Sequence, residues 1–148
     1  MRRDTWILIA DGARARVFQY DGPGKRLKAV EGWAFQGDHR ATHEIMSDRE
    51  GRVASSVGSA RSALQAHYDP HRELKRHFAG VIADALDRAL TEGMFDRLII
   101  VAEPTSLGDL RAALPERVRH KVTAELARDL TKTPDAELPD HLKKVLRM

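Results

Sequence analysis

The chain has 148 residues and contains no cysteine. Disulfide bonds, thiolate nucleophiles and thiolate metal ligands are therefore excluded. Long apolar runs are also missing, since Trp6–Ala10 and Leu98–Ala102 are only five residues each. A secretory signal needs an apolar stretch of about 7–15 residues, and a membrane-spanning helix needs about 20. We therefore expect a cytoplasmic protein with no signal peptide and no membrane span.

A strong excess of one charge is absent as well. Twenty-five Lys and Arg residues face 22 Asp and Glu residues, so the net charge is only +3. This balance permits binding to RNA or DNA but does not by itself indicate it. Apolar residues make up 42% of the chain, which is enough for one hydrophobic core. We expect one domain over residues 1–148.

The first third of the chain has the pattern of three antiparallel strands. Trp6–Ala10 is apolar without alternation, which indicates a strand covered on both faces. Asp11-Gly12 predicts a tight turn into a second strand, Ala13–Tyr20. Lys25–Phe35 predicts a third strand. On the second strand one face carries Arg14, Arg16, Phe18 and Tyr20, and on the third strand one face carries Leu27, Ala29, Glu31, Trp33 and Phe35.

The stretch from Gln36 to Asp69 has few large apolar residues and no clear period. A segment of this length without its own structure is unusual inside a compact domain, so it predicts a functional loop or a disordered one. We treat residues 36–69 as a long polar loop within the domain.

The rest of the chain alternates helices and strands. Asp69 and Pro70 are typical of a helix start, and Gly93 is typical of its end. The apolar stripe of this helix contains Leu74, Phe78, Val81, Ile82, Ala85, Leu86, Ala89 and Leu90. A buried strand at Leu98–Ala102, a short helix capped by Ser106 and stopped by Pro115, and a strand at Val122–Leu126 follow.

A last helix is expected after Thr133 and Pro134, and its apolar positions are Leu138, Leu142, Val145 and Leu146. The predicted order is β-β-β-α-β-α-β-α in a single α/β domain with a mixed five-stranded sheet. The two most apolar strands, the first and the fourth, should be central and adjacent, because a strand reached through a helix returns parallel.

Five short segments are spread in order over nearly the whole chain: Ala10–Phe18, Ser47–Arg52, Phe95–Ala102, Leu107–Arg111 and Asp129–Thr131. Together they resemble a bacterial family named for attachment to host cells. The order of elements also resembles the ribonuclease H-like topology, in particular the middle domain of the eukaryotic and archaeal peptide-chain release factor and its relative Pelota. This resemblance implies a relation to the ribosome.

The release factor carries a Gly-Gly-Gln triplet in the loop that corresponds to residues 36–69 here. This chain has no Gly-Gly-Gln there; its nearest features are Glu50-Gly51-Arg52 and Val57-Gly58-Ser59. Peptidyl-tRNA hydrolysis by the release-factor mechanism is therefore not expected, and we predict no cofactor.

Two sets of side chains are candidates for metal chemistry. Asp11 and Glu103 follow the first and fourth strands, so neighbouring strands would bring them to one sheet edge, as in a metal-dependent nuclease. The alternative is that both belong to ordinary turns, and no third carboxylate is evident. Four histidines offer a zinc set, but without thiolates we favour solvated side chains. They are His39, His43, His67 and His71.

Arginines offer a different site. Arg14 and Arg16 alternate outward on the second strand, while Arg49 and Arg52 lie in the polar loop. If the loop folds over that face, the four form an anion-binding surface suited to a phosphate backbone. The alternative is a solvated loop, because its acidic residues balance its arginines.

We therefore expect a non-catalytic binding or adaptor domain whose partner is the ribosome, RNA or a translation protein. The alternatives are a metal-dependent nuclease of ribonuclease H-like fold and a cell-surface interaction protein.

Overall fold

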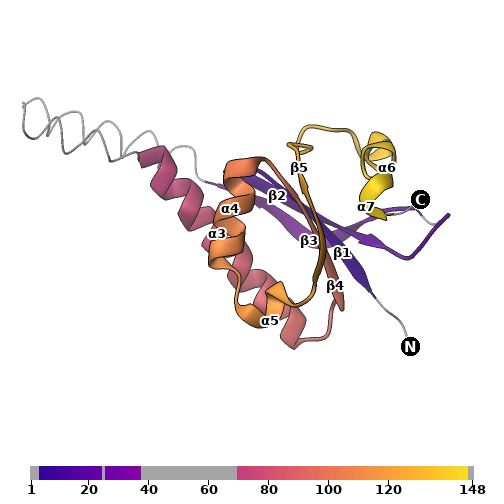
Figure 1. Ribbon diagram of the computed structural model, residues 1–148, viewed down its shortest axis with the longest axis horizontal. Helices are drawn as coiled ribbons and strands as arrows, with labels where there is room; N and C mark the ends of the chain where they lie inside the picture. Colours follow the sequence, from indigo (N-terminus) through magenta and orange to yellow (C-terminus); the bar gives the residue numbers. More distant parts are fainter. Residues whose placement is uncertain (1–3, 25, 38–69, 147–148) are drawn as a thin grey trace, which may run out of the picture.

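One mixed five-stranded sheet forms the centre of the protein. The computed structural model describes residues 4–24, 26–37 and 70–146 (Figure 1). Within them the strands lie in the order β3-β2-β1-β4-β5. The strands are β1 (Thr5–Ala10), β2 (Arg14–Tyr20), β3 (Lys28–Gln36), β4 (Arg97–Ala102) and β5 (Val122–Ala127). The predicted single α/β domain with a mixed five-stranded sheet is confirmed at this level.

The two most apolar strands, β1 and β4, lie side by side in the middle of the sheet. They run parallel, with Leu8 opposite Ile100, while β2 pairs antiparallel with the other edge of β1. Trp6–Ala10 is fully covered because β1 has a strand on each side and a layer of chain on each face. The prediction that these strands are central and adjacent is therefore correct.

Three helices cover one face, which we call the helical face. They are α3 (Pro70–Thr91), α4 (Pro104–Ala113) and α5 (Glu116–Arg119), and Figure 1 shows them together on one side of the sheet. Their apolar side chains pack on alternate residues of β1, β2 and β4. Trp6 stacks on Phe95 with ring centroids 5.0 Å apart and meets Trp33 edge-on at 4.7 Å, which fastens β3 to this core.

A shorter layer covers the opposite face, which we call the C-terminal face. It consists of η1 (Asp135–Glu137), α6 (Leu138–His141) and α7 (Lys143–Leu146), seen in yellow in Figure 1. Leu138 and Leu142 are fully buried against Ile7, Ile9 and Val101. The buried positions predicted for the last helix were Leu138, Leu142, Val145 and Leu146. The three leucines are buried in this cluster, and Val145 is partly buried and packs against it.

The order of elements differs from the prediction in two places. A separate helix, α5, follows Pro115, and three short helical segments replace the single last helix. Ser106 does not cap α4: the helix begins at Pro104 after Glu103, and Ser106 is buried inside the first turn.

The predicted faces of β3 and α3 also need correction. The pairing of β2 with β3 jumps from Arg16–Ala34 to Phe18–Ala29, so β3 bulges around Gly32, whose φ is +80°. The bulge changes the phase of the strand. Val30, Trp33 and Phe35 therefore pack on the helical face and Leu27 on the C-terminal face, while Ala29 and Glu31 are exposed.

On α3, Val81 was predicted in the core but is 41% exposed. The predicted stop at Gly93 is correct, because its φ of +73° permits the N–H groups of Gly93 and Met94 to bond Leu90 and Ala89. The predicted cap Asp69 lies outside the described residues.

Candidate functional site

The β1–β2 turn is organised by one carboxylate. Asp11 Oδ1 accepts the backbone N–H groups of Ala13 and Arg14, each at 2.7 Å, and the N–H of Asp11 donates to the carbonyl of Arg14 at 2.9 Å. This is the hydrogen-bonding pattern that makes Asp favourable at the start of a tight turn. The turn therefore places Arg14 at the end of the sheet where the parallel strands β1 and β4 finish.

The turn is tied to the chain that follows β5. The Thr131 hydroxyl lies 3.1 Å from Asp11 Oδ2 and 2.6 Å from Asp129 Oδ1. Asp129 also accepts the backbone N–H of Thr131 at 3.0 Å. The hydroxyl of Thr131 is the main cause that lowers the pKa of Asp129, and the charges of Lys132 and Arg14 lower it further.

Asp11 and Glu103 do lie at the same edge of the sheet. The residues before them, Ala10 and Ala102, are paired across β1 and β4. Their side chains have separate partners: Asp11 is engaged by its own turn, while Glu103 Oε1 accepts the hydroxyl of Ser106 at 3.0 Å. In residues 4–24, 26–37 and 70–146, no three His, Asp or Glu side chains gather closely enough to hold a metal ion.

The four histidines of the zinc alternative cannot be compared as a set. His71 lies on α3, whereas His39, His43 and His67 are outside the described residues.

The two arginines of β2 have different surroundings. Arg16 is anchored to the C-terminal face: Nη1 donates to Asp135 at 2.7 Å, and Nη2 donates to the carbonyls of Leu130 at 3.0 Å and Thr133 at 2.5 Å. An anion at Arg16 would have to compete with Asp135. Arg14 is freer, since its side chain is 44% exposed and its Nε is 3.8 Å from Asp11 Oδ2.

The other two residues predicted for this surface, Arg49 and Arg52, lie outside the described residues. On the side before them, the described chain ends at the turn, where the N–H of Gly37 donates to the Ala13 carbonyl at 2.5 Å. On the side after them, it resumes at Pro70, where α3 begins. Anion binding by the four arginines therefore stays a prediction.

Lys75 is a basic residue at the turn that the sequence did not single out. Its stem crosses Gly12 so closely that a Cβ at position 12 would come within 2.5 Å of Lys75 Cγ. Lys75 makes no hydrogen bond or ion pair with any other residue that the structure describes. No local pattern distinguishes it from other lysines on a polar helix face, because its contact with Gly12 is tertiary.

A hollow of about 330 Å³ lies beside Arg14. Ile9, Ala34 and Phe35 give it an apolar lining, and Arg14, Gln36 and Thr131 add polar groups. We call Arg14, Lys75 and this hollow the turn site. Arg14 borders the hollow, while Lys75 approaches the same turn from α3 on the helical face.

Two further carboxylates, those of Asp109 and Glu125, are paired with arginines. Arg72 forms a two-pronged pair with Asp109, and Arg111 binds Glu125 through Nε at 2.9 Å and Nη2 at 2.8 Å. The carboxylate of Glu125 raises the pKa of Arg111. The charges of these two acids are thus balanced locally, while the turn itself brings Arg14 and Lys75 close to the carboxylates of Asp11 and Asp129.

The fold and this edge together define a single-domain α/β protein with a charged turn at the carboxyl end of its parallel strands. The model of the family described as "Protein required for attachment to host cells" matches residues 6–142, and the chain belongs to that family. A search among curated proteins finds no match. Within the described ranges, no helix has the length and apolar character needed to cross a membrane.

Proposed function

We propose that this host-attachment family protein is a non-catalytic RNA-binding module linked to the translation machinery, and that the turn site receives single-stranded RNA. The observation that carries the proposal is the pair of cations at one turn. Arg14 keeps only a 3.8 Å contact with Asp11, and Lys75 has no described partner. Cations that form no close ion pair within the protein are available to bind phosphates.

The state of the nearby acids supports the same choice. Asp11, Glu103, Asp109 and Asp129 each accept hydrogen bonds from neighbouring groups of the protein. Asp11 in particular holds the turn through two amides. An acid engaged in this way is poorly placed to take a catalytic metal or a substrate proton without breaking the turn. The geometry therefore favours binding over hydrolysis.

The hollow beside Arg14 suits an unpaired nucleotide. Proteins recognise single-stranded RNA by packing bases on apolar or aromatic side chains and by hydrogen bonding to base edges. Ala34 offers apolar surface, while the Gln36 amide and the Thr131 hydroxyl offer donors and acceptors. We assign Arg14 and Lys75 to the phosphates and the hollow to a base.

Fluorescence anisotropy with short single-stranded and double-stranded RNA tests the proposal. The wild type is expected to prefer the single strand and to bind more weakly as salt rises. Arg14→Gln and Lys75→Gln should each weaken binding and reduce the salt slope by about 0.7, the value for one lost phosphate contact on a single strand. Arg119→Gln is the matched control, because Arg119 is exposed on α5 away from the turn.

Equal losses for Arg119→Gln and Arg14→Gln would reject the turn site. Sedimentation with ribosomes at low and raised salt tests the link to translation; absence from every ribosomal fraction at low salt would contradict it. Metal-dependent cleavage of the RNA that Asp11→Asn abolishes would instead establish a nuclease.

A further inference from the structure

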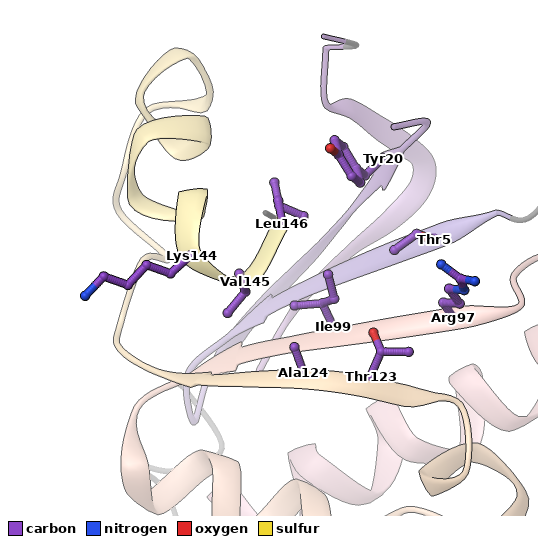
Figure 2. A pocket seen from close by; sticks show the side chains of 9 residues that line it. All are labelled: Thr5, Tyr20, Arg97, Ile99, Thr123, Ala124, Lys144, Val145 and Leu146. Carbon is purple, nitrogen blue, oxygen red and sulfur yellow. The ribbon is translucent and has the colours of Figure 1, made fainter. Parts of the chain in front are cut away.

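A second hollow, of about 470 Å³, lies at the opposite end of the sheet (Figure 2). It opens on the C-terminal face, over the amino ends of β1 and β4. Ile99 and Ala124 lie at the sheet, and Tyr20, Val145 and Leu146 add apolar surface. Figure 2 shows α7 on one side and the strands below.

The short C-terminal layer explains why the sheet is open here. Leu138 and Leu142 cover Ile7, Ile9 and Val101, which are fully buried. The C-terminal layer does not reach the first residues of β1 and β4. Thr5 is therefore only partly covered, and Arg97 is exposed. The pairing of β4 with β5 shifts between Leu98 and Ile99, which leaves Thr123 as an extra residue in β5. Thr123 and Ala124 both line this hollow.

The charge of the hollow comes from Arg97. Its side chain rises from β4 on the same side of the sheet as Tyr20, Thr5 and Ile99 in Figure 2, whereas the end of Lys144 points away from the group. Across the part of the chain that the structure describes, Arg97 has no carboxylate partner. Thr5 and Thr123 contribute hydroxyls near it.

The geometry points to a binding site for a small organic carboxylate with an apolar body. The guanidinium of Arg97 would take the carboxylate, since its planar N–H groups match two carboxylate oxygens. The apolar body would lie on Ala124 and Val145, the partly exposed apolar residues of the lining, next to the largely buried Ile99. A volume of about 470 Å³ is within the range of small-molecule sites, which combine apolar walls with a few polar groups.

This site is separate from the turn site. Thr5 begins β1 and Asp11 follows its end, which places them about 20 Å apart by the rise of a strand. The inference therefore does not rest on RNA binding.

The test uses the full chain and a matched pair of probes, 4-phenylbutyrate and its uncharged amide, 4-phenylbutyramide. Binding is followed by calorimetry and by the NMR shifts of Thr5, Ile99, Thr123 and Ala124. The carboxylate should bind in the millimolar range or tighter and move these signals, and the amide should bind about tenfold more weakly because it lacks the charge-assisted bonds.

Arg97→Gln should remove the preference for the carboxylate and leave amide binding unchanged. Ala124→Leu should weaken both probes, because the larger side chain enters the hollow. Arg119→Gln, which removes a charge on α5, should change the affinity for neither probe. Equal affinity of the wild type for both probes, shifts confined to other residues, or no shifts at millimolar carboxylate would each overturn the proposal. Unchanged melting temperatures show that the variants are folded.

Discussion

At the scale of single residues, Asp11 joins two parts of the chain that are distant in sequence. One oxygen closes the β1–β2 turn and the other accepts the hydroxyl of Thr131. Its side chain is 16% exposed, so water replaces these bonds poorly if they are lost. The local sequence Asp-Gly indicates the turn, but the bond to Thr131 spans 120 positions and has no local signal.

Removing the Asp11 carboxylate should therefore destabilise the fold. We expect Asp11→Ala to lower the free energy of unfolding by about 2 kcal/mol, the size associated with hydrogen bonds to a charged group. Asp11→Asn keeps an oxygen that can accept the turn amides, so it should cost clearly less. Urea unfolding of the two variants measures the difference. Equal losses would show that charge, and not the turn hydrogen bonds, is what Asp11 contributes.

Asp129 gives the stability of the protein a dependence on pH. Its pKa is lowered in the folded state, chiefly by the hydroxyl of Thr131. A lowered folded pKa contributes stability above the unfolded value, and this contribution is lost as pH falls through the folded value. Asp129→Asn should therefore be destabilising at neutral pH, and its difference from the wild type should shrink in acid, below the ordinary aspartate range.

Unfolding curves at neutral and acidic pH measure that difference. Asp84→Asn is the control, because Asp84 is exposed on α3 and makes no hydrogen bond or ion pair with another described residue. Its difference from the wild type should not show the same fall. A gap for Asp129→Asn that widens toward acid would contradict the assignment.

For the basic residues of the site, the sequence predicted which face of the strand they occupy but not their tertiary contacts. The alternation of β2 correctly separated Arg14 and Arg16 from Ala15 and Val17. It could not show that Arg16 binds Asp135, 119 positions away, or that Lys75 crosses Gly12. Both contacts depend on how the layers meet, and that information is absent from a single strand or helix.

At the scale of elements, α3 shows how narrow the boundary of an apolar stripe is. Its face toward the sheet includes Phe78, Ile82 and Leu86, all buried. Val81 precedes Ile82 by one residue, which turns it about 100° around the helix axis. An apolar residue at that angle fits a broad stripe in the sequence but faces solvent once the helix is docked.

Substituting these neighbours separately should give very different results. Ile82 is 0% exposed and Val81 is 41% exposed. We expect Ile82→Ala to cost about 2–5 kcal/mol through lost burial and a cavity, and Val81→Ala to stay within about 0.5 kcal/mol. Both changes leave a good helix former, so helix propensity does not account for the contrast. Similar losses of unfolding free energy in denaturant would mean that α3 is rotated from the orientation in which Phe78, Ile82 and Leu86 face the sheet.

The bulge in β3 likewise prevented a correct prediction of which β3 residues face each side of the sheet. The number and type of the five strands follow from apolar runs and turns. The face of each β3 residue depends on Gly32, where extra residues enter the pairing with β2. Because strand alternation has a period of two, one irregularity reverses every position beyond it. A lone glycine in the sequence did not reveal where that reversal occurs.

At the scale of the whole molecule, both cores depend on the same two strands. Trp6 and Leu8 of β1 join the cluster on the helical face, while Ile7 and Ile9 join the cluster on the C-terminal face. The same division holds for β4, with Ile100 on one side and Val101 on the other. The continuous apolar runs in the sequence predicted this arrangement, since only a strand covered twice needs them.

Native-state hydrogen exchange should therefore find the greatest protection in β1 and β4. Each lies between two strands and beneath cover on both faces, so their amides should exchange only through global unfolding. Within the described sheet β3 and β5 have one neighbour each, and their exposed positions alternate with partly buried ones over much of their length. They should open at lower free energy. Ile82→Ala, which weakens the shared core, should lower the exchange free energies of β1 and β4 by the same amount as the global stability. If β1 exchanges as readily as β3, or keeps its protection in that variant, the two layers are not held together through the central strands.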